Sequence, residues 1–263
     1  MDKPVLETRG LTIRFGGHVA VDNVSASFHA GTLTAIVGPN GAGKTTYFNL
    51  ISGQLPATSG HVLLDGAEVT RLGPAQRARL GIGRAFQLTN LFPNLTVHEN
   101  VRLAVQSRAG GGANLLSRWS SRRDWVDEAD RFIAAANLTD KRDMPAVALP
   151  HGDKRKLEVA IMMALEPHVF MFDEPTAGMS VDDVPVILDL IKALKEEGSK
   201  TILLVEHKMD VVKSLADRIV VLHNGQLVAD GVPAEVIGSA VVQEAYLGVA
   251  AGPTRATSGA GHG

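Results

Sequence analysis

A glycine-rich segment that ends in a lysine and a threonine carries the strongest chemical signal in the chain. It consists of Gly38, Pro39, Asn40, Gly41, Ala42, Gly43, Lys44 and Thr45, in the pattern G-x-x-x-x-G-K-[ST]. Glycines at this spacing let successive backbone N–H groups curl around phosphate oxygens, and the positive end of a following helix adds to the attraction. Lys44 would reach the β- and γ-phosphates of a nucleotide, Thr45 would hold Mg²⁺ through its hydroxyl, and Thr46 would cap the α-phosphate. The segment therefore predicts a phosphate loop.

An acidic pair in the second half of the chain adds the chemistry of hydrolysis. Asp173 and Glu174 follow the apolar run 169–172, which predicts a buried strand. An aspartate at the end of such a strand can bind the magnesium shell, and a glutamate one residue later can polarise the attacking water as general base. Taken alone, the pair could equally be two capping carboxylates. Together with the upstream phosphate loop it predicts a nucleotide hydrolase.

His207 is the third candidate for catalysis. It follows Glu206 and the apolar run 201–205, which predicts another strand. A parallel neighbouring strand would bring the imidazole to the same edge of the sheet, where it could contact the γ-phosphate or the attacking water. A lone histidine at a strand end is more often structural, so its assignment depends on the two motifs above.

Composition excludes several other classes of protein. The 263 residues include 26 Lys and Arg against 28 Asp and Glu, a net charge of −2, so no global basic field points to nucleic acid. The absence of cysteine excludes disulfides, thiolate metal sites and cysteine catalysis. No apolar stretch approaches the ~18 residues of a membrane-spanning helix, and residues 1–10 lack the apolar run of a signal peptide. If the protein acts at a membrane, we therefore expect it to do so through a partner protein.

Strands and helices alternate around the three motifs. Residues 1–30 predict short strands, and Asn224-Gly225 predicts a hairpin. Apolar runs predict further strands at residues 33–37, 60–66, 169–172, 201–205, 219–223 and 226–229. Apolar residues at helical spacing predict helices at residues 45–52, 97–105, 124–137, 154–165, 183–197 and 208–216. Apolar strands separated by helices predict an α/β fold with a mainly parallel sheet covered on both faces.

The middle of the chain differs, because helical signals dominate from Asn94 to Leu149. We predict one domain over residues 1–250, with a β/α core at 1–93 and 160–250 and an inserted helical subdomain at 94–159. Residues 107–121 contain three consecutive glycines and predict an exposed insertion. The Gly-, Ala-, Ser- and Thr-rich residues 251–263 predict a disordered tail.

In this order, the motifs closely resemble those of the ATP-binding subunits of ABC transporters, and the resemblance runs from Leu6 to Leu247. Phe15 stands where that family stacks an aromatic ring on adenine. Gln87 resembles the glutamine that touches Mg²⁺ and senses the membrane subunit, and His207 stands at the switch histidine. Residues 149–153 stand at the family's signature loop, in which Leu149, Gly152 and Asp153 would contact nucleotide. The resemblance implies a RecA-like P-loop NTPase core with an N-terminal antiparallel β-subdomain.

Within that family, the chain most resembles the subunits that power importers of branched-chain amino acids and related amides. The segments that carry this resemblance are Arg14–Gly17 with Ala20-Val21, Gly83–Gln87, Phe92–Asn100, Leu204–Met209 and Glu244–Gly248. Subunits of urea importers and of lipopolysaccharide export share several of them, so both remain alternatives. A regulatory ABC module without a transport role is a further alternative.

The resemblance also implies partners. Two such subunits, as a homodimer or as a heterodimer with a related subunit, would close head to tail around two ATP molecules. The signature loop of one would cover the nucleotide held by the phosphate loop of the other. Closure would act on two membrane permease subunits, served by a solute-binding protein, at the cytoplasmic face of the plasma membrane. Hydrolysis at Glu174 would reset the pair, and no nucleic acid is expected to bind.

Two residues depart from the family pattern. Pro150 stands where the signature has a serine, and it has neither a hydroxyl nor an N–H group. Ser180 stands where the family usually has aspartate or asparagine after the catalytic glutamate. Both lie at the expected interface between subunits, so we expect them to affect hydrolysis more than nucleotide binding.

Overall fold

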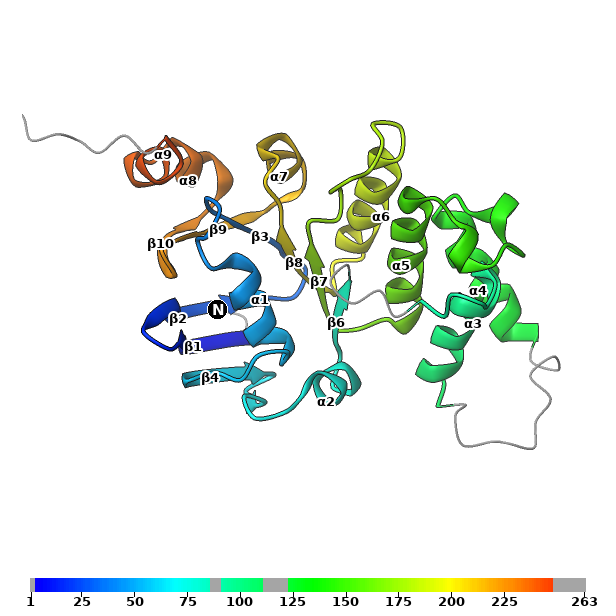
Figure 1. The fold of residues 1–263 in the computed structure, drawn as a ribbon, viewed down its shortest axis with the longest axis horizontal. Helices are drawn as coiled ribbons and strands as arrows, with labels where there is room; N and C mark the ends of the chain where they lie inside the picture. Colours follow the sequence, from blue (N-terminus) through cyan, green and yellow to red (C-terminus); the bar gives the residue numbers. More distant parts are fainter. Residues whose placement is uncertain (1–2, 86–90, 111–122, 248–263) are drawn as a thin grey trace, which may run out of the picture.

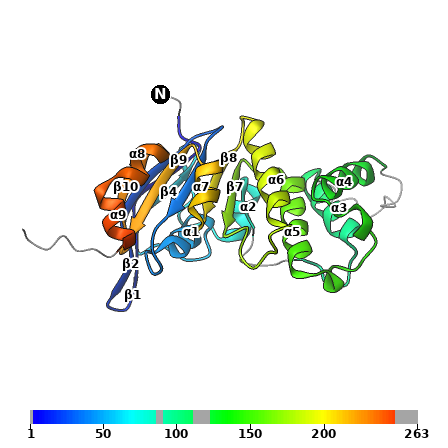
Figure 2. The same ribbon diagram turned by 90° about the horizontal axis from the view of Figure 1, so that it is seen from above.

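The computed structural model describes residues 3–85, 91–110 and 123–247. In Figure 1, two sheets occupy one side of the molecule and a layer of helices the other. Seen from above, the molecule is elongated, and α3–α5 lie at the end opposite to β1 and β2 (Figure 2). Within the described ranges, no helix is both long and apolar enough to cross a membrane.

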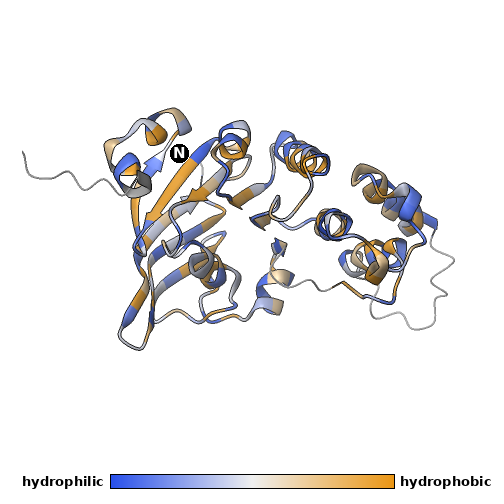
Figure 3. Ribbon diagram, turned by 45° about the horizontal axis from the view of Figure 1, so that its top comes forward, coloured by the Kyte–Doolittle hydropathy of each residue, from blue (hydrophilic) through white to orange (hydrophobic). Residues whose placement is uncertain are grey.

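The larger sheet has six strands in the order β10-β9-β3-β8-β7-β6. These strands are β3 (Leu33–Val37), β6 (Ile82–Ala85), β7 (Val169–Asp173), β8 (Thr201–Val205), β9 (Arg218–His223) and β10 (Gln226–Gly231). All neighbours are parallel except β10, which pairs antiparallel with β9. Every residue of β3, β7 and β8 is buried, and Figure 3 shows mostly hydrophobic strands among helices that carry both colours. The predicted α/β class and mainly parallel sheet are confirmed.

The smaller sheet is antiparallel, in the order β2-β1-β4-β5. Its strands are β1 (Leu6–Phe15), β2 (His18–Phe28), β4 (Ser59–Leu64) and β5 (Ala67–Glu68). Helix α1 (Lys44–Ser52) lies beside this sheet (Figure 1) and buries Tyr47, Phe48 and Ile51 in a core shared by both sheets. The hydroxyl of Tyr47 is 2.7 Å from that of Thr8, so the buried tyrosine keeps a hydrogen-bond partner.

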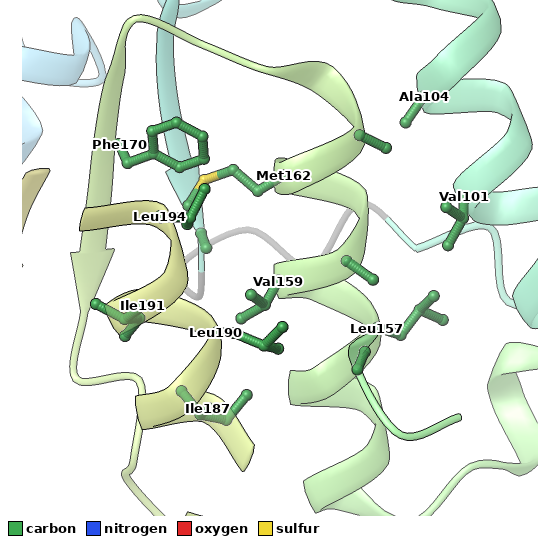
Figure 4. Packing of buried hydrophobic residues seen from close by; sticks show 14 of the residues in the cluster. Val101, Ala104, Leu157, Val159, Met162, Phe170, Ile187, Leu190, Ile191 and Leu194 are labelled. Carbon is green, nitrogen blue, oxygen red and sulfur yellow. The ribbon is translucent and has the colours of Figure 1, made fainter. Parts of the chain in front are cut away.

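Helix α5 (His151–Leu165) is buried on two faces. Val159 and Met162 pack against α6 (Val184–Glu196), whereas Leu157 faces Val101 on α3 (Figure 4). The other helices are α2 (Pro74–Arg79), α3 (Val97–Arg108), α4 (Arg123–Ala135), α7 (Met209–Leu215), α8 (Pro233–Gly238) and α9 (Ala240–Leu247). Helices α7, α8 and α9 contribute apolar residues to a third cluster on β3 and β9.

Most predicted elements are confirmed, and the differences have local causes. Strands β3 and β8 have the predicted bounds, and the hairpin between β9 and β10 turns at Asn224 and Gly225 with φ of 48° and 79°. Helix α5 begins at His151 rather than at Lys154, because Pro150 occupies the N-cap position and proline suits a helix start. The sequence analysis did not predict α2, α8, α9, β5 or β6, which are short.

The predicted domain boundary falls between residues 159 and 160, inside the continuous helix α5, and the division stays a prediction. The tail at residues 251–263 and most of the insertion at 107–121 lie outside the described residues.

A buried arginine closes the far end of the phosphate-loop helix. Arg77 on α2 is 2% exposed, and it donates hydrogen bonds to the carbonyls of Leu50 and Ile51 at 2.6 Å. It also donates to the carbonyls of Thr70 and Leu72. Burial lowers the pKa of Arg77 to about 10. A cation at this place satisfies the last carbonyls of α1 and complements the negative end of its dipole.

We predict that Arg77→Met lowers the free energy of unfolding by ~2–4 kcal/mol, because it leaves four carbonyls without their charged donor. Urea unfolding followed by circular dichroism measures this loss. Arg79→Met is the matched control, since Arg79 is exposed on the same helix. Equal stability of the two variants would contradict the role given to Arg77.

Candidate active site

The phosphate loop connects strand β3 to helix α1, and its backbone requires glycine at two positions. Gly38 has a φ of +152°, and a Cβ there would lie 2.1 Å from the carbonyl oxygen of Leu222. Gly43 has a φ of +97°, and a Cβ there would lie 2.5 Å from the carbonyl oxygen of Ala20. Any other residue at these positions would displace neighbouring backbone. The loop is therefore packed between β2 and β9, with the N-terminus of α1 at its end.

A pocket of about 340 Å³ opens over this loop. It brings together the three chemical signals of the sequence, which come from β3, β7 and β8. Its lining residues are His18, Ala20, Asn40, Gly41, Ala42, Gly43, Lys44, Thr45, Thr46, Glu174 and His207. The volume, the polar backbone and the position at the carboxyl edge of parallel strands are those of a nucleotide phosphate site.

Lys44 is buried, with 6% of its surface exposed. Its ammonium donates hydrogen bonds to the carbonyl oxygens of Gly38 at 2.7 Å and Pro39 at 2.9 Å. Burial lowers the pKa of Lys44, while the charges of Glu174 and Asp173 raise it. The ammonium is thus held at the loop, where a phosphate would offer it an anionic acceptor in place of two neutral carbonyls.

Glu174 and His207 meet across two neighbouring strands. The register of β7 and β8 pairs Asp173 with Val205, so the residues that follow each strand lie at the same edge. The Nε2 atom of His207 is 2.7 Å from Oε1 of Glu174. Glu174 itself has a φ of 52°, and its N–H donates to the carbonyl of Val205 at 2.9 Å. This left-handed turn and the bond to β8 hold the glutamate at the pocket.

Glu206 is a functional neighbour to which the sequence analysis gave no role. It is 3% exposed, and its carboxylate accepts the hydroxyl of Thr176 at 2.6 Å and the N–H of His207 at 3.1 Å. The buried carboxylate therefore ties the turn after Glu174 to the turn that carries His207. A glutamate directly after a mainly apolar strand was the signal that could have identified it.

Arg84 is the second residue that the sequence analysis left without a role. Its guanidinium donates to Oδ2 of Asp173 at 2.8 Å, and the two side chains are only 6% and 4% exposed. It also donates to Asn49 and Ser52 in the last turn of α1 and lies over the ring of Phe48. Burial raises the pKa of Asp173, and Arg84 lowers it. An arginine within the family-like segment Gly83–Gln87 was the available signal.

The structure does not bring every predicted residue to the pocket. Phe15 is 49% exposed and does not line it, although Phe15 pairs with His18, which does. Leu149, Gly152 and Asp153 lie at the start of α5 and are absent from the lining. Asp173 lies directly before Glu174 and is also outside the lining. Gln87 lies outside the described residues.

A strand, a phosphate loop and a helix, with an acidic pair and a histidine on adjacent strands, define a phosphate-loop nucleotide hydrolase. The model of the ABC transporter family matches residues 21–177. The chain is 37% identical over 255 residues to the high-affinity branched-chain amino acid transport ATP-binding protein BraF of Pseudomonas aeruginosa. It is equally identical to the corresponding protein LivG of Escherichia coli K12. Both alignments cover 95% of this chain and 100% of the relative.

Solved structures agree with this similarity. The ADP conformation of MJ1267, an ATP-binding cassette of an ABC transporter, has a TM-score of 0.79 at 30% identity and covers 94% of this chain and 100% of its own. A dimeric post-hydrolysis state of the cassette MJ0796, bound to ADP and Pi, has a TM-score of 0.73 at 26% identity, with 86% and 98% covered. The chain therefore belongs to the ABC transporter family, and it is an ATP-binding ATPase of that family.

We predict that Lys44→Ala loses ATP binding, whereas Glu174→Gln keeps it and loses turnover by ~10²–10⁴-fold. Lys44 meets phosphate charge that is already present in bound ATP, but Glu174 acts on the water only during the reaction. Equilibrium binding of a fluorescent ATP analogue and release of inorganic phosphate measure the two effects.

Lys192→Ala and Glu197→Gln are the controls for charge and folding, because both residues are exposed on or beside helix α6. They should leave binding and turnover unchanged. Tight ATP binding by Lys44→Ala, or near-normal hydrolysis by Glu174→Gln, would contradict the assigned roles.

Proposed function

We propose that this chain is the ATP-hydrolysing subunit of an importer for branched-chain amino acids or related small amides. The observation that carries the proposal is the 37% identity to BraF and LivG over the full length of those proteins. The pocket supports the ATPase part independently of the comparison, because it combines a phosphate loop, an acidic residue and a histidine. Solute choice rests on the relatives alone.

In the proposed mechanism the phosphate loop binds ATP before any chemistry occurs. Backbone N–H groups of residues 40–45 and the N-terminus of α1 surround the phosphates, and Lys44 contacts the β- and γ-phosphates. Thr46 caps the α-phosphate. Phe15 is exposed and pairs with His18 of the pocket lining, and it stacks on the adenine ring.

Mg²⁺ fits the side chains that are present. The hydroxyl of Thr45 and the carboxylate of Asp173 are oxygen donors, which this ion prefers. Arg84 contacts Oδ2 of Asp173 and keeps the carboxylate fixed in a buried place. Gln87 is a further proposed contact. When bound, the ion would neutralise charge on the β- and γ-phosphates.

Hydrolysis then depends on the pair Glu174 and His207. The carboxylate of Glu174 takes a proton from water as the water oxygen attacks the γ-phosphorus. The bond between the γ-phosphorus and the β,γ-bridging oxygen breaks, and ADP and inorganic phosphate leave. The 2.7 Å contact with His207 fixes the direction of that carboxylate, and His207 also contacts the γ-phosphate. Most of the rate enhancement comes from positioning and charge stabilisation, because the protein forms no covalent bond to the phosphoryl group.

The signature loop completes the site only across a dimer. Leu149, Gly152 and Asp153 do not line the pocket of their own chain, and the cassette MJ0796 forms a dimer with ADP and Pi. Two copies, or one copy and a related subunit, would each cover the other's ATP. The closed pair would act on two permease subunits at the cytoplasmic face of the plasma membrane, supplied by a solute-binding protein, with no nucleic acid involved.

We predict that the Glu174→Gln variant is monomeric alone and dimeric with Mg-ATP, because bound ATP bridges the two chains and cannot be hydrolysed. Light scattering after size-exclusion chromatography measures the mass in both states. Lys44→Ala is the control and should stay monomeric. An unchanged mass of Glu174→Gln on addition of Mg-ATP would contradict the ATP-driven dimer.

We predict that deletion of the gene abolishes uptake of radiolabelled leucine by whole cells. Wild-type protein should restore uptake, and Glu174→Gln should not, because transport requires turnover. Urea uptake in the same strain serves as the comparison. Loss of urea uptake alone would favour a urea importer, and normal uptake of both with an envelope defect would favour lipopolysaccharide export.

A further inference from the structure

Two loops that are distant in the sequence touch at the start of helix α5. One is the signature loop, residues 149–153. The other, residues 178–183, follows the turn of the catalytic glutamate and is called the β7–α6 loop below. The ring of His151 lies against Gly178, where an added Cβ would be 3.3 Å from the Nε2 atom. Because Gly178 has a φ of +71°, a larger residue there would be strained as well as crowded.

A second contact joins the same loops through a carboxylate. Asp183 lies directly before α6, and a Cβ on Gly152 would meet its Oδ2 atom at 2.7 Å. The same oxygen accepts the hydroxyl of Ser180 at 2.7 Å. The other oxygen accepts a hydrogen bond from the ammonium of Lys156 on α5. The serine that departs from the family pattern therefore holds Asp183 in the direction of α5.

Lys156 is the centre of a neutral chain of charges. It is 5% exposed, and its ammonium also contacts Oδ1 of Asp153 at 3.2 Å. Oδ2 of Asp153 accepts from Lys141, at the end of the short helical turn Thr139–Lys141. The order Lys141, Asp153, Lys156 and Asp183 alternates in sign and sums to zero. Hydrogen bonds from Lys156 and Ser180 hold the pKa of Asp183 below its ordinary value, so this carboxylate is charged at neutral pH.

We propose that Lys156 and Asp183 are positioning residues that join the signature loop and the β7–α6 loop into one rigid surface for ATP-driven closure. The inference rests on the dimer proposed above. Separating Lys156 from Asp183 removes one of the two carboxylates that compensate the buried ammonium, which is unfavourable, so the two loops move together. The apolar packing of α5 on α6 (Figure 4) supports the same arrangement from the neighbouring turns.

The proposed coupling connects the ATP of the partner subunit to the hydrolysis site of the same chain. The β7–α6 loop begins a few residues after Glu174, and the signature loop would meet the ATP held by the partner subunit. When the signature loop of one subunit engages the ATP held by the partner subunit, it therefore positions the β7–α6 loop of the same chain at the hydrolysis site of that chain. Binding of ATP to one open chain does not use this connection, because neither loop lines the pocket.

The test uses Lys156→Met, Asp183→Asn and the double variant in the full-length chain. We expect ATP affinity of the monomer to stay within about twofold of wild type. We expect turnover to fall roughly tenfold, and the ATP concentration that half-dimerises the Glu174→Gln background to rise by a similar factor, as for residues in one buried network. Turnover and dimerisation of the double variant should be no lower than those of the more impaired single variant. Lys156→Arg should keep more turnover than Lys156→Met.

Lys192→Met and Asp189→Asn form the control pair, because these residues make an exposed ion pair on α6. Both should behave as wild type. The inference is overturned if turnover and dimerisation of the Lys156 and Asp183 variants equal wild type, or if their ATP affinity falls as much as their turnover, since that indicates general loss of structure. Failure of Glu174→Gln itself to dimerise would instead contradict the proposed dimer, and the comparison of turnover with ATP affinity would still decide the inference.

Discussion

The parallel pairing of β3, β8 and β7 is the constraint on which the site depends. Parallel strands end at the same edge, so the phosphate loop after β3, the glutamate after β7 and the histidine after β8 reach one pocket although they are distant in the sequence. A register shift of one residue would turn Asp173 and Val205 to the other face of the sheet. Complete burial of these strands makes such a shift unfavourable, because their apolar side chains are packed on both faces.

Helix α1 connects this edge of the sheet to two buried arginines, Arg77 and Arg84. Its N-terminus faces the pocket, where anions are stabilised, and the guanidinium of Arg77 satisfies the carbonyls at its other end. Arg84 joins the last turn of α1 to Asp173. The phosphate loop and Asp173 are therefore held by one helix and two buried arginines, and a disturbance at either arginine acts on both motifs.

The signature loop depends on a different kind of constraint. Alternating charges along Lys141, Asp153, Lys156 and Asp183 connect it to the β7–α6 loop. Asp153 and Lys156 are buried, whereas Lys141 and Asp183 are each 31% exposed. A buried ion pair contributes little net stability, but removing a partner from the buried ammonium of Lys156 is unfavourable. Such a device favours one relative position of two loops, which suits a surface that must meet a second subunit in a single way.

The sequence by itself determined the fold class, the phosphate loop, the acidic pair and the family, since these depend on local spacing and on runs of apolar residues. It placed β3 and β8 at their observed bounds, because a mainly apolar run bounded by polar or glycine residues admits few alternatives. Only the tertiary structure decided the long-range partners of Arg77, Arg84, Glu206 and Lys156, which lie 27 or more residues away in the sequence. Charged residues are usually exposed, so a sequence pattern assigns each of them to the surface. Each can be buried because groups that the fold brings to it compensate its charge or accept and donate its hydrogen bonds.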